Sequence, residues 1–186
     1  FVFSSSCTVY GQADELPITE NAPVKEAESP YGNTKKIGEQ MIKDLCNCND
    51  SFAAIALRYF NPIGGHSSAK IGELPIGVPQ NLVPFVTQTA IGIRKELSIF
   101  GKDYPTPDGT CIRDYIHVVD LAKAHIVALN RLFDEKKSNH YEVFNIGTGK
   151  GSSVLEVVNA FMRVTGVNLN YCFTDRRYGD IVSAYA

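Results

Sequence analysis

The amino-acid sequence predicts an α/β protein with a parallel β-sheet. Short apolar runs, typical of buried strands, alternate along the chain with longer amphipathic segments that are typical of helices. The run over residues 53–59 is almost continuously apolar, as expected of a strand that helices cover on both faces. The length of 186 residues is enough for one compact domain, or for one domain and part of another.

The first third of the chain contains the clearest elements. Residues 1–3 indicate a short buried strand, which a serine-rich turn follows. Ser29 and Pro30 are the residue types preferred at the N-cap and the first position of a helix. An apolar stripe continues this helix to about residue 46, and the strand over 53–59 comes next.

Residues 61–81 break this alternation. The segment contains four Gly and three Pro, and long irregular loops in compact domains are usually functional. The remaining expected elements are, in order, a helix over 81–95, a strand over 97–100, a turn-rich segment over 101–110, a strand over 115–118, a helix over 120–133, a strand over 143–146, and a helix that begins with capping-box spacing at Ser153 and Glu156 and ends near Gly166.

Composition excludes several classes of protein. Lys and Arg number 18 and Asp and Glu 20, so the formal net charge is −2. A generic nucleic-acid-binding polycation is therefore excluded, and no apolar run approaches the length of a membrane span. The five cysteines and four histidines are scattered without metal-ligand spacing. We expect no metal site, reduced thiols and a cytoplasmic protein.

Tyr31 and Lys35 form the first candidate site. Four positions apart on a helix, they share one face. A fixed positive charge beside a tyrosine favours the phenolate, which can act as a general base. From Tyr31 and Lys35 alone, a solvated helix face without a catalytic role is an equally good interpretation.

The serine run from Ser4 to Ser6 follows the first strand. Open α/β sheets bind ligands at the carboxyl ends of their strands, so a serine here can hydrogen-bond the same hydroxyl that a nearby tyrosine deprotonates. An ordinary polar turn is the alternative. A serine hydrolase is disfavoured, because the chain has no G-x-S-x-G elbow.

Six segments together carry a resemblance that covers nearly the whole chain. They are SSSCTVYG (4–11), PYGNTK (30–35), LRYFNPIG (57–64), GVPQNLVP (77–84), IFGKDYPTPDGTCIRDYIHV (99–118) and RRYGD (176–180). In this order and spacing they resemble the extended short-chain dehydrogenase/reductase family and, within it, the UDP-glucose (UDP-galactose) 4-epimerases of galactose metabolism.

The resemblance implies a Rossmann-type doubly wound parallel sheet, of which this chain holds part, and a smaller α/β substrate-binding region. Residues 1–60 would be the later part of the NAD-binding domain and 61–186 mainly the UDP-sugar-binding region, with a segment of about 111–150 returning to the Rossmann domain. The glycine-rich NAD-binding turn and the acidic residue that selects NAD over NADP are expected before Phe1, so the chain is predicted to be an internal portion of a larger protein. A homodimer is also implied.

The implied reaction is reversible inversion at C4 of a UDP-hexose through a 4-keto intermediate, with tightly held NAD as the cofactor. Tyr31 would take the proton of the substrate O4 hydroxyl. Ser6 would hydrogen-bond O4 and share the proton relay, and Lys35 would bind the nicotinamide ribose.

The resemblance also implies two sets of ligand contacts. The NAD-binding residues would be Ser4, Ser5, Ser6, Tyr31, Lys35, Tyr59, Phe60 and Pro62. The UDP-sugar-binding residues would be Ser6, Tyr31, Tyr59, Phe60, Asn61, Gln80, Asn81, Leu82, Ser98, Ile99, Phe100, Arg113, Tyr115, Arg177, Asp180 and Ala184.

Among the substrate contacts, Arg113 and Arg177 would bind phosphate, as suits a guanidinium, and Asp180 the uridine ribose. Structural roles are the alternatives, with Asn81 as a helix cap and Arg113 as the ion-pair partner of Asp114. Ala184 stands where the family varies between tyrosine and small residues. Its small side chain predicts that N-acetylated UDP-hexosamines are also accepted.

Other functions remain open on the sequence. UDP-xylose/arabinose and UDP-glucuronate 4-epimerases would share the mechanism. A 4,6-dehydratase is disfavoured, because Ser6, Cys7 and Thr8 stand where that chemistry needs acidic residues. A non-catalytic sugar-nucleotide-binding module would not need the proton relay of Ser6, Tyr31 and Lys35.

Overall fold

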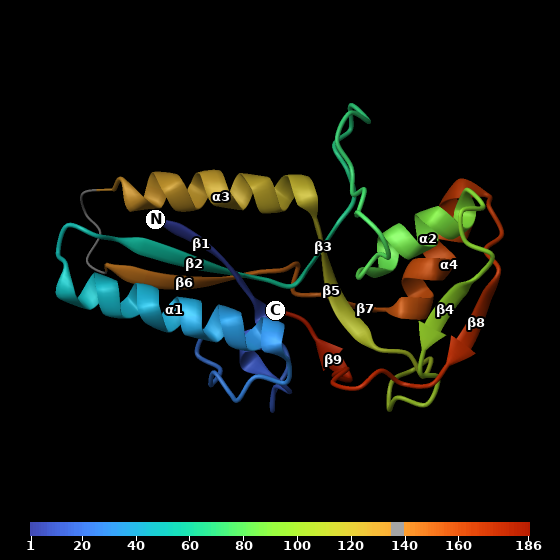
Figure 1. The fold of residues 1–186 in the computed structure, drawn as a ribbon, viewed down its shortest axis with the longest axis horizontal. Helices are drawn as coiled ribbons and strands as arrows, with labels where there is room; N and C mark the ends of the chain where they lie inside the picture. The colour runs from blue at the N-terminus through green and yellow to red at the C-terminus, as the bar shows by residue number, and fades with distance from the viewer. Residues whose placement is uncertain (135–139) are drawn as a thin grey trace.

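A computed structural model describes residues 1–134 and 140–186 of the chain. A three-stranded sheet between two long helices forms one half, and two short strands beside two helices form the other (Figure 1). Short strands connect the halves. The observed architecture is the predicted α/β fold with parallel sheets, of Rossmann type.

The first sheet contains β1 (Val2–Ser6), β2 (Ala54–Tyr59) and β6 (Tyr141–Ile146), all parallel and in the order β1-β2-β6. Ser6 pairs with Tyr59, and Tyr59 with Ile146. The carboxyl ends of the three strands therefore lie at one edge, where ligands bind in such sheets. Helix α1 (Pro30–Cys48) covers one face and α3 (Val118–Leu132) the other (Figure 1).

Helix α1 begins where the sequence predicts. The Ser29 side chain accepts a hydrogen bond from the Gly32 N–H at 3.1 Å, and Pro30 occupies the first turn. The helix lies close against β1 because Gly38 has no side chain. A Cβ there would come within 2.6 Å of Cζ of Phe3. The sequence thus brings the helix that carries Tyr31 and Lys35 directly onto the first strand.

The central strands surround β5 (Ile112–His117). Strand β5 pairs in parallel with β3 (Asn61–Ile63) and β9 (Ser183–Ala184) and antiparallel with β7 (Gly151–Ser153). Of the segment of about 111–150, α3 and β6 accompany the first sheet, whereas β5 belongs to these central strands.

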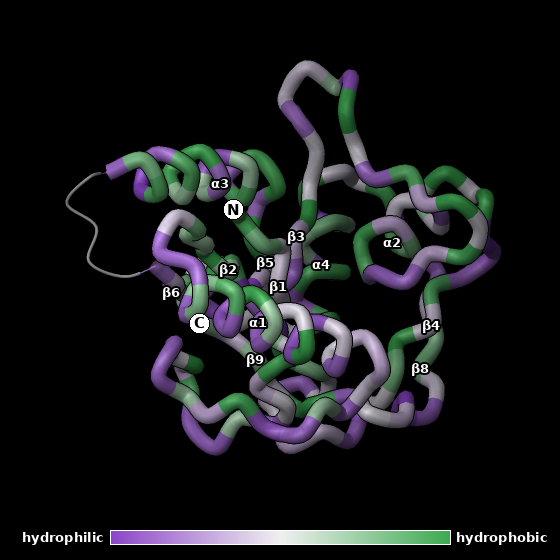
Figure 2. The backbone as a smooth tube through the Cα atoms, turned by 60° about the vertical axis from the view of Figure 1, so that its left-hand side comes forward, coloured by the Kyte–Doolittle hydropathy of each residue, from purple (hydrophilic) through white to green (hydrophobic). Residues whose placement is uncertain are grey.

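The other half has its own core. Strands β4 (Leu97–Phe100) and β8 (Tyr171–Thr174) pair in parallel beside α2 (Leu82–Ala90) and α4 (Val154–Thr165). Its buried apolar residues are Val86, Leu97, Ile99, Val158 and Leu169. Figure 2 shows the alternation of hydrophobic and hydrophilic residues along an amphipathic helix most plainly on α3.

Several predicted boundaries are wrong. The helix expected over 81–95 ends at Ala90, because the chain then turns through Gly92 at a φ of +79°. The first residues of the expected loop over 61–81 form β3, which pairs with β5. The strand expected over 115–118 starts at Ile112.

Other boundaries differ by one to three residues. Helix α3 begins at Val118 rather than residue 120, because His117 Nδ1 accepts from the Val119 N–H at 3.2 Å. Strand β6 begins at Tyr141 rather than residue 143, and β1 extends to Ser6. The capping box of Ser153 and Glu156 is confirmed.

No helix within residues 1–134 and 140–186 combines the length and the apolar character that a membrane crossing requires.

Candidate active site

Ser6 lies at the carboxyl end of β1, where the chain enters the short helix η1 (Cys7–Tyr10). Its backbone is extended, and its Oγ accepts from the Thr8 N–H at 3.3 Å. The cap holds the Ser6 oxygen at the sheet edge, almost buried. Burial raises the pKa of the neighbouring Cys7 thiol to about 11, so Cys7 stays uncharged near neutral pH.

Tyr31 and Lys35 lie in the first turns of α1 and face the same edge. The Lys35 Nζ donates to the Ser4 carbonyl at 2.9 Å and lies 5.4 Å from the centre of the Tyr31 ring. This single hydrogen bond leaves two ammonium protons for a ligand. Tyr31 is 55% exposed, so its hydroxyl is accessible. The structure thus places Tyr31 and Lys35 beside β1, the strand that ends at Ser6.

Tyr59 ends β2 next to this group. Its hydroxyl lies 2.7 Å from Ser4 Oγ and 2.5 Å from His125 Nε2, which α3 contributes. Burial raises the pKa of Tyr59 above the ordinary value of a phenol, and the Tyr31 phenol raises it further. The sequence did not indicate His125, because a lone histidine in an amphipathic helix carries no motif.

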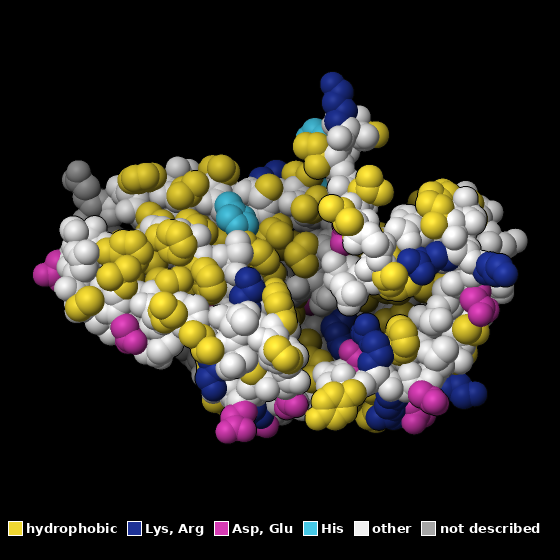
Figure 3. All heavy atoms as spheres, viewed as in Figure 1, with side chains coloured by type: hydrophobic (Ala, Val, Ile, Leu, Met, Phe, Trp, Pro, Cys, Tyr) yellow, Lys and Arg dark blue, Asp and Glu magenta, His cyan; other side chains and the backbone are white. Residues whose placement is uncertain are grey.

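A second cluster joins Arg113 of β5 to Arg177 and Asp180. The Arg177 guanidinium binds the Asp180 carboxylate through two N–H groups at 2.9 and 3.1 Å, and Arg113 Nη2 lies 3.7 Å from it. The Arg177 guanidinium also lies 4.8 Å from the ring centre of Phe100. Figure 3 shows basic side chains around an acidic one in a hollow between the two halves.

The structural alternative for Arg113 is wrong, since Asp114 does not pair with it. The Asp114 carboxylate instead accepts from the Thr148 hydroxyl at 2.6 Å and from the backbone N–H groups of Thr148 and Gly149. Arg113 is thus left to approach Asp180, and its Nη1 donates to the Ile112 carbonyl at 2.9 Å.

Asn81 occupies the N-cap position of α2, but its side chain makes no capping bond. Its amide donates to Glu73 Oε1 at 2.8 Å in the long loop. The neighbouring Gln80 is exposed, and Leu82 begins α2 half-buried. Asn61 and Pro62 lie in β3, which pairs with β5 between the two halves.

Three of the residues predicted to bind the UDP-sugar, Ser98, Ile99 and Phe100, lie in β4. Its side chains alternate, so Ile99 is buried in the core of that half while Ser98 is exposed and Phe100 half-buried. A ligand could meet the side chains of Ser98 and Phe100 but only the backbone of Ile99. In β5, burial raises the pKa of Tyr115 to about 12, so Tyr115 remains a neutral phenol.

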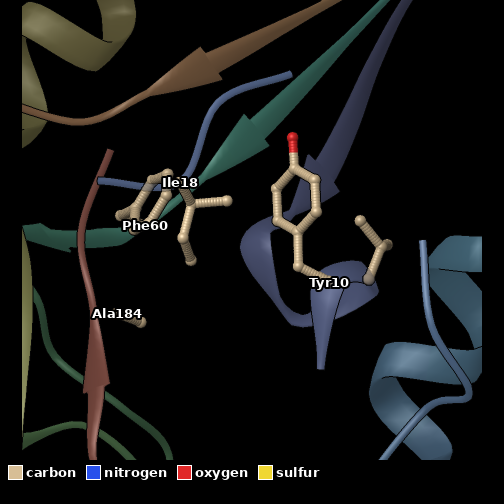
Figure 4. Close-up of a cluster of buried hydrophobic side chains, with 5 residues drawn as sticks. Tyr10, Ile18, Phe60 and Ala184 are labelled. Atoms are coloured by element: carbon tan, nitrogen blue, oxygen red, sulfur yellow. The ribbon is translucent and has the colours of Figure 1, made fainter. Parts of the chain in front are cut away.

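Phe60 and Ala184 belong to a buried apolar cluster with Val9, Tyr10 and Ile18. Figure 4 shows Ala184 on β9 facing this cluster, with Phe60 and Ile18 on neighbouring segments. Ala184 is 2% exposed. Its small side chain therefore packs within this cluster, and its predicted effect on the sugar stays a prediction.

A buried polar network that the sequence did not indicate lies beneath the site. Arg58 of β2 binds Glu39 of α1 through Nε at 2.9 Å and through Nη2 at 2.5 Å. Ser5 donates to the same carboxylate at 2.5 Å, and Arg58 Nη1 donates to the Tyr10 hydroxyl at 2.8 Å. The network ties α1 to the two strands that end at Ser6 and Tyr59.

The donors at the sheet edge suit a ribose or hexose hydroxyl. Lys35 retains two protons, the Tyr31 hydroxyl is exposed, and Thr8 Oγ1 is buried without a hydrogen-bond partner among the described residues. The group therefore fits the nicotinamide ribose and the reacting sugar. Within residues 1–134 and 140–186, no three metal-binding side chains gather. The expectation of no metal stays a prediction.

Comparison with known proteins adds independent information. The profile of the "NAD dependent epimerase/dehydratase family" matches residues 1–147. The chain is 49% identical to a UDP-glucose 4-epimerase of Drosophila melanogaster over 186 residues, and 51% identical to one of Bacillus subtilis over 185. Both alignments cover 100% of this chain and 53% of the relative. The chain thus spans about half the length of the curated relatives it matches.

Solved structures agree with this comparison. A UDP-glucose 4-epimerase of Stenotrophomonas maltophila, with bound NAD and formylated UDP-arabinopyranose, superimposes with a TM-score of 0.93 at 48% identity. A UDP-glucose 4-epimerase of Bifidobacterium longum, in complex with NAD⁺ and UDP, superimposes with a TM-score of 0.92 at 47% identity. Each alignment covers 100% of this chain and 54% of the other. Together with the site, these matches show that the chain belongs to the NAD dependent epimerase/dehydratase family.

Proposed function

We propose that the natural protein interconverts UDP-galactose and UDP-glucose by NAD-dependent inversion at C4. The observation that carries this proposal is the position of the Lys35 ammonium, beside the Tyr31 ring and bonded to β1, the strand that ends at Ser6. A phenol, an ammonium and a hydroxyl in this arrangement suit a sugar alcohol that is oxidised and reduced again. The relatives named UDP-glucose 4-epimerase support the choice of substrate.

The chain's own residues move the proton. The Tyr31 phenolate oxygen takes the proton of the O4 hydroxyl, while Ser6 hydrogen-bonds O4 and keeps it aligned. The Lys35 ammonium, 5.4 Å from the Tyr31 ring, stabilises the negative phenolate and binds the ribose hydroxyls. Bound NAD supplies a reversible acceptor for the C4 hydride.

Inversion requires the reverse step on the other face of the sugar. The oxidation leaves a ketone at C4 and the proton on Tyr31. After the 4-keto sugar turns over, the hydride returns to the opposite face of C4 and Tyr31 gives its proton back to O4. No net proton or electron is consumed, so Tyr31 ends in its starting state.

The second cluster suits the nucleotide. The Asp180 carboxylate holds two guanidinium groups close together. Its oxygens lie 3.7 Å from Arg113 Nη2 and 2.9 Å from Arg177 Nε. Their remaining N–H groups can bind a diphosphate, and the half-buried Phe100 offers a ring face to the uracil base. This arrangement would anchor UDP while the sugar turns over.

The remaining inferences concern the whole protein. The small residue type at position 184 is the basis for proposing that UDP-N-acetylhexosamines are accepted as well. All five cysteines are free thiols, which supports a cytoplasmic protein. The resemblance supports a homodimer, which sedimentation of the natural protein would check.

The test is conversion of UDP-galactose to UDP-glucose by the natural protein and its Tyr31→Phe variant, measured by proton NMR. Without the phenol, kcat should fall by roughly 100-fold or more, while UDP binding by calorimetry stays within about twofold. Tyr178→Phe is the matched control, because Tyr178 is fully exposed. UDP binding without any C4 inversion in the unaltered protein would instead identify a sugar-nucleotide-binding module.

A further inference from the structure

The hydroxyl of Tyr59 has one proton and two hydrogen-bond partners. Ser4 Oγ lies 2.7 Å away on β1, and His125 Nε2 lies 2.5 Å away on α3. The two rings are tilted at 57° with centres 5.6 Å apart, so the contact is edge-on rather than stacked. The direction of these bonds decides which groups of the site can still donate.

The other nitrogen of His125 settles that direction. His125 Nδ1 lies 2.9 Å from the carbonyl oxygen of Leu121, one turn earlier in α3. A carbonyl only accepts hydrogen bonds, so Nδ1 must carry the proton. In the neutral ring, Nε2 then has only a lone pair, and the Tyr59 hydroxyl must donate to it. Each hydroxyl of the Ser4–Tyr59 pair can donate or accept, so once the Tyr59 proton is directed to His125 the Ser4 hydroxyl must be the donor in this pair.

We propose that His125 is a positioning residue that accepts the Tyr59 proton and holds this phenol in one orientation and one protonation state beside Tyr31. The inference rests on the proposed function for its catalytic consequence. Both hydrogen-bond partners of His125, a carbonyl and a phenol, are uncharged, which suits a neutral imidazole.

The consequence concerns two phenols at one site. Epimerisation needs one ionised tyrosine next to O4, and a second phenolate nearby would repel it. Burial and the proximity of Tyr31 raise the pKa of Tyr59, and an acceptor at its hydroxyl further favours the neutral form. His125 therefore leaves Tyr31 as the phenol that exchanges a proton with the substrate.

The direct test is the protonation of the His125 ring, measured by nitrogen-15 NMR of the histidine-labelled natural protein. The His125→Gln variant assigns the signals by their loss. We expect a protonated, pyrrole-type Nδ1 and an unprotonated, pyridine-type Nε2. A protonated Nε2 would overturn the proposal, because the ring would then donate to Tyr59.

Kinetic variants test the positioning role. His125→Phe should lower kcat for UDP-galactose by about fivefold to tenfold, the loss expected of one hydrogen bond, and leave KM within about twofold. His125→Gln can place its amide oxygen near Nε2 and should restore kcat to within about twofold. His140→Gln removes an exposed histidine and is the control.

A double-mutant cycle separates this role from packing. In the Tyr59→Phe background the hydroxyl is absent, so His125→Phe should cause no further loss of kcat. An unchanged kcat in His125→Phe, or an equal loss in both backgrounds, would overturn the proposal. Absence of epimerase activity in the unaltered protein would contradict the proposed function, while the NMR result would still decide the direction of the hydrogen bonds.

Discussion

At the scale of single residues, the candidate site contains one pair from a single helix and one pair from distant segments. Tyr31 and Lys35 are one helical turn apart, so their common face follows from the period of the helix. Arg113 and Asp180 are far apart in sequence, and only the resemblance placed them at one ligand. The structure brings their charged atoms within 3.7 Å. Neither helical spacing nor the resemblance indicated His125, so the sequence did not predict it.

Arg113 offers a test of the cluster that we propose binds UDP. Arg113→Met removes one guanidinium from the pair held by Asp180, and a charged hydrogen bond of about 1.5–3 kcal/mol corresponds to roughly a 10–100-fold weaker Kd for UDP. Isothermal titration measures the change. Arg163→Met, at an exposed position of α4, is the control. A Kd within threefold of the unaltered protein would remove Arg113 from the binding site.

Ala184 offers a test of sugar selectivity. The unaltered protein should convert UDP-GlcNAc to UDP-GalNAc, and Ala184→Tyr should abolish that conversion while UDP-galactose is still epimerised. Because Ala184 packs against Phe60 and Ile18 in a buried cluster, the thermal midpoint of the variant must be measured alongside. No turnover of UDP-GlcNAc by the active unaltered protein would contradict the prediction.

At the scale of elements, the position of α1 decides the geometry of the site. The helix carries Tyr31 and Lys35, approaches β1 through Gly38, and is fixed to β2 by the pair of Glu39 with Arg58. The sequence predicted the helix and the strand but not this pair, because a charge in an amphipathic pattern is normally exposed. Here both side chains are nearly buried.

The buried pair makes a prediction about stability. Glu39→Gln leaves the Arg58 charge buried without a carboxylate, which should lower the free energy of unfolding by about 3–5 kcal/mol. Chemical denaturation of the natural protein measures the loss. Lys123→Gln breaks the exposed pair with Asp120 and should change stability by less than about 1 kcal/mol. Equal effects of the two substitutions would contradict the structural role of the Glu39 pair.

At the scale of the whole molecule, the fold class was predictable and the joining of the halves was not. The long helices and the apolar strand β2 can be predicted from the local pattern of apolar residues. Strands β3, β7 and β9 have two or three residues each, which is too short for a pattern, and all three depend on distant pairing with β5. The pairing of Arg113 with Ala184 in β9 brings Asp180 into the site.

We propose that C4 is inverted by removal and return of the same hydrogen within the site. The most direct measurement is proton NMR of UDP-glucose made from UDP-galactose by the natural protein in D₂O. In the proposed mechanism the C4 hydride does not reach solvent and the proton on Tyr31 moves only to and from oxygen, so we predict full retention of hydrogen at C4. Deuterium at C4 would contradict the account, since it would show that the carbon exchanges its hydrogen with water.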